Sequence, residues 1–197
     1  MTQYKKVRRT IRALFKTTAG PRVDLHTKVL EGRVSPIVDG LHQVYLRPGE
    51  LLVLRQPCQI TTVLGSCVAV TMFHARLGFA AICHGMLPEP NRANGDISAD
   101  PRRFNYLSEA IPFMGARFRA LGVFPHEVEV KIFGGGNVLG FEESDSSRRL
   151  VGQSNIEMAH RTLAAEKLLI KASSVGGDAG RKILFNTQTG EVLHKFL

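Results

Sequence analysis

One cysteine and one histidine lie near each other in an apolar part of the sequence. Cys67 ends a Gly65-Ser66-Cys67 turn that follows an apolar, β-branched run at residues 59–64, and His84 stands seventeen residues later. A thiol is a weak nucleophile at its ordinary pKa, and a neighbouring imidazole activates it by taking its proton or stabilising the thiolate. The two residue types therefore predict covalent chemistry at Cys67, provided that the fold brings them together.

The surrounding sequence predicts a β-hairpin that would position this pair. Residues 68–73 and 79–86 are strand-like, and residues 74–78 supply the turn between them. With Ala75 and Arg76 at the tip, Cys67 lies directly across from His84 on the same face, with Cβ atoms about 4.5–5.5 Å apart. A register slip of one residue would place His84 on the opposite face.

Groups beside the pair can complete a site. Thr61 and Thr62 precede the cysteine on the adjoining strand, and one of them can point toward the same face. A threonine hydroxyl or carbonyl there would hold the imidazole in the required tautomer. The backbone amides of Ser66 and Cys67, presented by Gly65, are candidate oxyanion donors, each worth about 2.7–4 kcal/mol of transition-state stabilisation.

The three cysteines also limit which other kinds of site the chain can form. Cys58 and Cys83 lie in apolar, strand-like contexts typical of buried, unreactive thiols, which is also the alternative for Cys67. Three cysteines without C-x-x-C spacing predict no disulfide scaffold and suit a reducing compartment. Cys58, Cys67, Cys83 and His84 lack the close ligand pairs of structural zinc sites, so we expect neither a metal nor another cofactor.

Several motifs together resemble one family. LGSCVAV at residues 64–70, followed by HGMLP at 84–88, is similar to the CheD family of chemoreceptor glutamine deamidases. KIFGGGN at 131–137, VGG at 175–177 and GRK at 180–182 are similar to its later motifs, and the resemblance runs from about Val44 to the C-terminus. It implies that Cys67 is the nucleophile, His84 the base, and Thr61, six residues before the cysteine, the orienting threonine.

The resemblance also implies a function. It indicates a hydrolase acting on side-chain amide C–N bonds, which converts glutamines of chemoreceptors to glutamate through a Cys67 thioester and so supports chemotactic adaptation. The implied partners are the cytoplasmic helices of chemoreceptors (methyl-accepting chemotaxis proteins) and a CheC-type phosphatase, and the implied location is cytoplasmic, at receptors on the inner membrane face. The alternative is a regulatory module that binds receptor or phosphatase with weak or no catalysis.

Two positions depart from the usual pattern of that family. His74 stands in the hairpin turn where an aspartate is usual, and Ser174 stands before residues 175–177 where an acidic residue is common. Neither belongs to the implied catalytic trio, so these departures bear on the details of partner binding rather than on the reaction.

Charge is concentrated at the start of the chain. Of a net charge of +9, residues 1–30 contribute +7, from eight basic side chains and one acidic one. Such a tail can attract anionic lipid, nucleic acid or an acidic protein surface, but no nucleic-acid motif accompanies it, so we expect no nucleic-acid partner. We predict a basic N-terminal extension at 1–34, flexible or amphipathic and able to contact a membrane surface, and a CheD-like cysteine amidohydrolase domain at 35–197.

Two helices and further strands are predicted around the hairpin. One helix runs over 100–121, opened by Asp100-Pro101 and kinked or divided at Pro112. The other runs over 154–168, opened by a capping box that begins at Ser154. Its inward stripe comprises Ile156, Ala159, Leu163 and Leu168.

The remaining strands determine the predicted fold class. Residues 128–133 form a strand that enters a glycine turn at 134–136, whose spacing fits neither nucleotide-binding fingerprint. Residues 181–185 and 191–197 form a C-terminal hairpin. Because the strands pair mainly as hairpins, we predict a single-domain α+β fold with a largely antiparallel, sandwich-like β-layer and helices packed outside it.

Overall fold

The computed structural model describes residues 35–38, 41–91, 97–138 and 151–197. The predicted N-terminal extension at 1–34 lies outside the described residues. The described residues contain two α-helices, α2 (Leu107–Arg119) and α3 (Val151–Ala165). They also contain ten strands: β1 (Ser35–Val38), β2 (Leu41–Tyr45), β3 (Leu51–Leu54), β4 (Cys58–Leu64), β5 (Val68–His74), β6 (Phe79–Gly85), β7 (Glu129–Gly134), β8 (Ile170–Val175), β9 (Arg181–Asn186) and β10 (Val192–Phe196).

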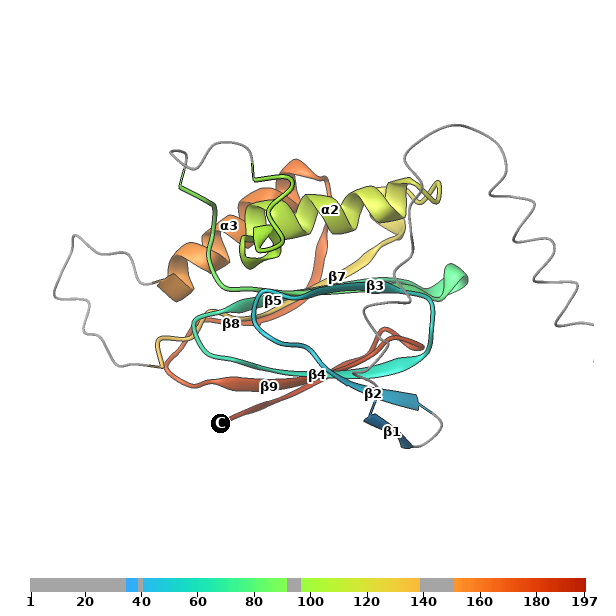
Figure 1. Ribbon diagram of the computed structural model, residues 1–197, viewed down its shortest axis with the longest axis horizontal. Helices are drawn as coiled ribbons and strands as arrows, with labels where there is room; N and C mark the ends of the chain where they lie inside the picture. The colour runs from blue at the N-terminus through green and yellow to red at the C-terminus, as the bar shows by residue number, and fades with distance from the viewer. Residues whose placement is uncertain (1–34, 39–40, 92–96, 139–150) are drawn as a thin grey trace, which may run out of the picture.

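The strands form two five-stranded sheets. The outer sheet has the order β1-β2-β4-β9-β10, and the central sheet has the order β3-β6-β5-β7-β8. Both helices cover one side of the central sheet, and the outer sheet lies on its other side (Figure 1). In the described part of the chain, pairing is antiparallel apart from the parallel pairs β2–β4 and β7–β8. The predicted α+β class, with a largely antiparallel, sandwich-like β-layer and helices outside it, is confirmed.

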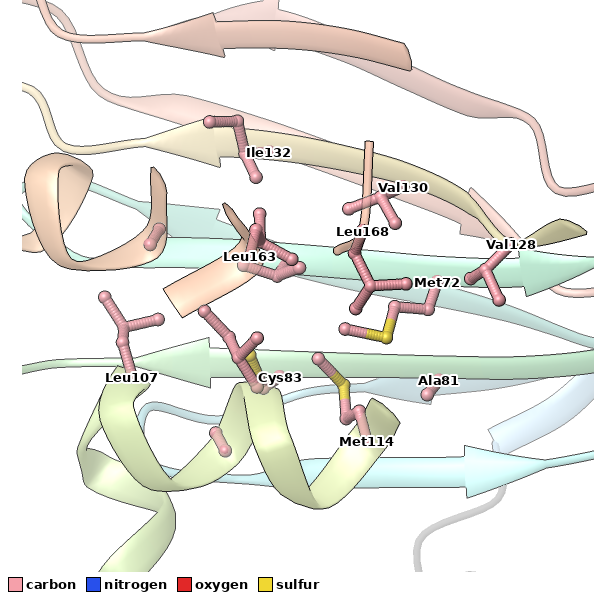
Figure 2. Packing of buried hydrophobic residues seen from close by; sticks show 14 of the residues in the cluster. Met72, Ala81, Cys83, Leu107, Met114, Val128, Val130, Ile132, Leu163 and Leu168 are labelled. Carbon is pink, nitrogen blue, oxygen red and sulfur yellow. The ribbon is translucent and has the colours of Figure 1, made fainter. Parts of the chain in front are cut away.

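The central sheet is buried on both faces, so its middle strands carry few polar residues. Every residue of β5 and β6 is buried. Alternate residues, among them Met72, Ala81 and Cys83, pack toward α2 and α3, as Figure 2 shows. The intervening residues, such as Ala69 and Ile82, pack against the outer sheet. Because successive side chains of a strand alternate between faces, each of these strands contributes to two cores.

The β5–β6 turn differs from the predicted two-residue tip. A single 3₁₀ turn (Ala75–Leu77) joins the strands, and Gly78 closes it with a φ of 54°, in the left-handed region. The backbone N–H of Leu77 donates to Nδ1 of His74 at 3.2 Å, so this histidine caps the turn as an aspartate would. The longer loop shifts the register, and Ala69 rather than Cys67 pairs with His84.

Both helices are present, but their predicted starts are wrong. The first helix begins at Leu107 rather than near Asp100, whose carboxylate instead accepts from the backbone N–H of Arg102 at 2.8 Å. Helix α2 continues through Pro112 without division. The second helix includes Ser154 in its interior, so the predicted capping box does not open it. The predicted inward stripe of this helix is buried as expected, and the C-terminal hairpin is β9–β10.

Candidate functional site

The turn at residues 65–67 connects the two sheets. Strand β4 of the outer sheet ends at Leu64, and β5 of the central sheet begins at Val68. Cys67 is half-buried and packs against the apolar cluster between the sheets. Cys67 therefore lies where the chain crosses from one layer to the other.

His84 lies on β6, beside this crossing. It pairs with Ala69, two residues after the cysteine, so Cys67 lies diagonally across from the histidine. The register differs from the predicted one by two residues, and an even shift leaves both side chains on the same face. Diagonal neighbours in an antiparallel pair are about 7–8 Å apart between backbones, and their Cβ atoms are somewhat closer. The structure thus brings the predicted pair to one face, although not directly opposite each other.

Thr62, and not Thr61, contacts the imidazole. The Thr62 hydroxyl lies 2.8 Å from Nδ1 of His84, whereas Thr61 lies on the outward-facing side of β4. The structure thus places Thr62, rather than the Thr61 implied by the resemblance, against the imidazole, and the role of Thr61 itself stays a prediction. Strand periodicity explains the placement, because Thr62 is in phase with Ile60 and Leu64, which both point into the sandwich. That phase was readable in the sequence and is the signal that distinguishes Thr62 from Thr61.

The hydroxyl of Thr62 also fixes the tautomer of His84. Thr62 donates its single proton to the carbonyl oxygen of Leu46 at 2.8 Å. The same oxygen must then accept a proton from Nδ1–H of His84. Nε2 is therefore the unprotonated nitrogen, which is the form of a histidine that acts as a base.

The other ring nitrogen of His84 is buried without a partner. Nε2 has no hydrogen-bond partner within the described residues, and the residue is only 1% exposed. Burial lowers the pKa of His84 to about 4, and the nearby Glu50 carboxylate and Leu46 carbonyl oppose this only in part. An unpaired buried polar atom is rare in a folded protein and marks a place where a functional partner can bind.

The thiol is also neutral at rest. Burial raises the pKa of Cys67 above its ordinary value, and the residue's own backbone N–H offsets this in part. With the pKa of His84 lowered and that of Cys67 raised, both partners are uncharged near neutral pH. This arrangement favours transfer of the thiol proton during attack over a preformed thiolate–imidazolium pair.

Three hydrogen bonds hold the turn that carries Cys67. The carbonyl of Gly65 accepts from the N–H of Gly136 and that of Cys67 from the N–H of Gly135, both at 2.8 Å. The carbonyl of Ser66 accepts from Nδ2 of Asn155 at 3.0 Å. All three carbonyls of the turn are thus engaged by the glycine segment after β7 and by helix α3. Sequence reasoning did not identify Asn155, because its neighbour Ser154 fitted a helix-capping motif.

The glycine segment at 134–136 packs closely against this turn and against helix α3, and this packing requires residues without side chains. Gly134 has a φ of 106°, and a Cβ there would lie 2.2 Å from the Cys67 carbonyl oxygen. A Cβ on Gly135 would lie 2.5 Å from the side chain of Ile156. Only residues without side chains allow β7 to approach the turn at residues 65–67 so closely.

The side chain of Arg181 binds backbone carbonyls in and around the same glycine segment. Its nearly buried guanidinium donates to the carbonyls of Gly134, Gly176 and Ala179, and its Nε donates to the Ser174 hydroxyl at 3.1 Å. Ser174, noted in the sequence for not being acidic, therefore supplies a neutral acceptor to this arginine. A guanidinium presents five donors in a fixed plane, which suits it to bind several carbonyls together.

The other two cysteines do not take part in the site. Cys58 and Cys83 are fully buried, as predicted, and burial raises the pKa of Cys83 to about 12. Across the described ranges, no three histidine, cysteine or acidic side chains gather as metal ligands would. No helix among the described residues has the length and apolar character needed to cross a bilayer.

Comparisons with known proteins relate the chain to one family. The family model described as "CheD chemotactic sensory transduction" matches residues 86–196. A relative from Geobacter sulfurreducens, named "Probable chemoreceptor glutamine deamidase CheD 2", is 45% identical over 157 residues, covering 80% of this chain and 91% of the relative. Two more relatives carry the name "Probable chemoreceptor glutamine deamidase CheD". The one from Oleidesulfovibrio alaskensis is 44% identical and covers 80% of this chain and 74% of the relative.

The other, from Maridesulfovibrio salexigens, is 35% identical over 80% of this chain and 93% of the relative. The family match begins two residues after His84, and the alignments to the relatives extend over a longer part of the chain. The family implied by the cysteine, histidine and glycine motifs is therefore confirmed: this chain belongs to the CheD family.

Proposed function

We propose that this protein is a glutamine deamidase that acts on chemoreceptors, with Cys67 as nucleophile and His84 as base. One observation carries the proposal: Nε2 of His84 is buried and unpaired within the described residues, while Thr62 fixes the tautomer that leaves this nitrogen unprotonated. The names of the relatives supply the substrate class.

Acylation begins when a glutamine side chain reaches Cys67. Sγ attacks the carboxamide carbon as its proton passes to Nε2 of His84, and the carbonyl oxygen takes the negative charge. The backbone amides of Ser66 and Cys67, on the turn that begins at Gly65, donate to this oxyanion. The imidazolium then gives its proton to the departing nitrogen, the C–N bond breaks, and ammonia leaves behind a thioester.

Deacylation reuses the same groups. His84 takes a proton from water as the water oxygen attacks the thioester carbon. The C–S bond then breaks, the imidazolium returns its proton to Sγ to regenerate the Cys67 thiol, and the carboxylic acid that forms releases its proton to solvent. Thr62 stabilises the transient imidazolium in both steps because it accepts from Nδ1–H throughout. Each cycle converts a neutral carboxamide to a carboxylate, and glutamates formed in this way would supply the sites of chemotactic adaptation.

The partners follow from the same proposal. The substrate is a glutamine on the cytoplasmic helices of a chemoreceptor, so the protein would act in the cytoplasm at the inner membrane face. A CheC-type phosphatase is a second proposed partner. The contact of residues 1–34 with a membrane surface is a proposal that rests on their charge alone.

Peptide mapping of a receptor cytoplasmic domain tests the reaction. Wild type should add about one mass unit at particular glutamines, as amide is replaced by acid, and Cys67→Ala should abolish this change. His84→Asn should slow it by about 10²–10⁴-fold, the usual contribution of a general base. Cys58→Ala, which removes a buried thiol elsewhere in the sandwich, is the matched control and should retain activity.

The same experiment distinguishes deamidation from a second candidate function, which is binding without catalysis. If wild type binds the receptor domain but produces no mass change and no ammonia, the chain acts as a binding module and the deamidase proposal is wrong. Loss of the mass change in both Cys67→Ala and Cys58→Ala would instead show that the thiols are needed for the fold.

A further inference from the structure

We propose that Asn155 is a positioning residue that fixes the nucleophile turn relative to the strand that carries the base. Its Nδ2 donates to the carbonyl oxygen of Ser66 and to that of Met86, both at 3.0 Å. Ser66 immediately precedes the nucleophile, and Met86 lies two residues after the base. A single amide group therefore connects the two segments that bear the reacting side chains.

The orientation of this amide follows from its partners. Both contacted groups are carbonyl oxygens, which only accept, so the atom facing them must be the NH₂ and not the oxygen. The two protons of Nδ2 are then both used. The other atom, Oδ1, is buried and has no hydrogen-bond partner within the described residues, and Asn155 is 0% exposed.

A polar side chain at this place is costly if packing is its only role. Helix α3 buries apolar neighbours such as Ile156 and Ala159 against the central sheet. An apolar residue in place of Asn155 would avoid burying an unpaired oxygen, but it would also leave the Ser66 and Met86 carbonyls without this donor. The amide is therefore explained by the two carbonyls it joins rather than by the helix core.

The two backbone hydrogen bonds of the turn described above do not make this connection. The carbonyls of Gly65 and Cys67 bind the segment after β7, which lies on the opposite side of β5 from β6. One bond of Asn155 instead reaches Met86, the residue that follows the end of β6, two residues beyond His84. Because a displacement of about 1 Å in a catalytic group can cost 10²-fold in rate, this bridge would determine how well the thiol meets its base.

A double-mutant cycle tests the inference without a receptor. The inference rests on the Cys67–His84 pair of the proposed function, so the cycle measures that pair directly: p-nitrophenyl acetate acylates the thiol and releases p-nitrophenolate as the thiol proton is taken up. The burst rate near pH 7 is compared among wild type, Asn155→Asp, His84→Asn and the double variant, with the Cys67→Ala rate subtracted. The aspartate has the shape of asparagine but, as a carboxylate, cannot donate to either carbonyl.

If Asn155 positions the turn, the effects of the Asn155 and His84 substitutions on the burst rate should be strongly non-additive. Asn155→Asp should slow the burst by about 10-fold or more, and His84→Asn should then cost less than about 3-fold further, since a misplaced base contributes little. An equal effect of His84→Asn in both backgrounds would overturn the inference while leaving the proposed function intact. No effect of His84→Asn even in wild type would overturn both, because His84 would not be the base.

Controls separate positioning from loss of stability. Leu163→Ala empties a buried site near the other end of α3, so it should destabilise the fold while retaining the dependence of the burst on His84. If Asn155→Asp fails to fold, Asn155→Ser, whose hydroxyl is small and donates once, takes its place in the cycle. If neither variant gives a cooperative unfolding transition, Asn155 is a structural residue and the positioning role is wrong.

Discussion

Thr62 and His84 belong to different sheets, and their 2.8 Å hydrogen bond crosses the sandwich between them. The bond joins β4 of the outer sheet to β6 of the central sheet at the end where the nucleophile turn passes from one to the other. The orientation of the base therefore depends on how the two layers pack. A change that slides the sheets would alter the site without touching any of its residues.

Substitution of Thr62 should affect catalysis, while the same change one residue earlier should not. Thr62→Val removes the oxygen that accepts from Nδ1–H of His84, and we expect deamidation to slow by about 10–100-fold, as when an orienting partner of a functional histidine is lost. Thr61→Val is the matched control, since its side chain lies on the outward face of β4. Rates of glutamate formation with a receptor domain give the comparison, and Thr62→Ser should restore most of the loss. Equal losses in the two valine variants would contradict the assignment.

The stability of the protein should depend on His84 in weakly acidic solution. In the folded protein its pKa is lowered to about 4, whereas in the unfolded chain it lies near 6.5. Between these values only the unfolded state takes up the proton, so the free energy of unfolding should fall as pH drops, by up to roughly 3 kcal/mol from this group. Urea unfolding at about pH 7 and about pH 4.5 measures the difference. His84→Asn should lack this component, and an identical pH dependence in that variant would show that His84 titrates normally.

The thiol of Cys67 should be uncharged in the resting protein. Because burial raises its pKa, thiolate absorbance near 240 nm should appear only at a pH above the range in which an ordinary cysteine ionises. The difference spectrum between wild type and Cys67→Ala isolates this thiol from Cys58 and Cys83. Thiolate absorbance already present at neutral pH would instead indicate a preformed ion pair with His84.

The glycine segment offers a test of how closely β7 packs against the nucleophile turn. Gly134→Ala would bring a Cβ within 2.2 Å of the Cys67 carbonyl oxygen, so we expect loss of activity. We also expect a fall of more than about 3 kcal/mol in the free energy of unfolding. Gly177→Ala is the matched control, because its φ is also left-handed, at 71°, but a Cβ there meets nothing within 4 Å.

That control should cost only about 1–2 kcal/mol, from the backbone conformation alone, and should retain activity. Chemical unfolding and deamidation rates of the two variants supply the comparison. Similar behaviour of the two alanine variants would mean that backbone conformation, and not the contact with Cys67, determines the need for glycine at 134.

Strand patterns predicted most of the fold because burial on two faces leaves a clear mark in the sequence. The apolar runs around Cys67 and His84 became β4, β5 and β6 with errors of about one residue. The hairpin register was wrong because it depends on the turn, and the sequence at 74–78 did not distinguish a two-residue tip from a 3₁₀ turn closed by Gly78. The pair still met on one face because the error was an even number of residues.

The supporting residues were harder to predict because their partners are distant in the sequence. Asn155 bonds to Ser66 and Met86, which precede it by 89 and 69 residues. Such contacts depend on how α3 crosses the central sheet, and local patterns contain no information about that crossing. The cysteine and histidine were identifiable because they stand seventeen residues apart around one hairpin, whereas Thr62, Asn155 and the glycine segment come from β4, from α3 and from the end of β7.

The alternation along β6 limits how the gene for this protein can change. Cys83 packs toward the helices and its neighbour His84 toward the outer sheet, so two adjacent codons specify residues of different layers. An insertion or deletion of one codon within the strand would reverse the two faces. The imidazole would then lie in the apolar core beneath the helices, and the thiol would lie beside Thr62. An insertion or deletion within the loop at 75–78 would leave the alternation along β6 unchanged, although the pairing of β6 with β5 depends on that turn. The strand that carries His84 must therefore keep its phase, since a change of one residue within it reverses which layer each side chain faces.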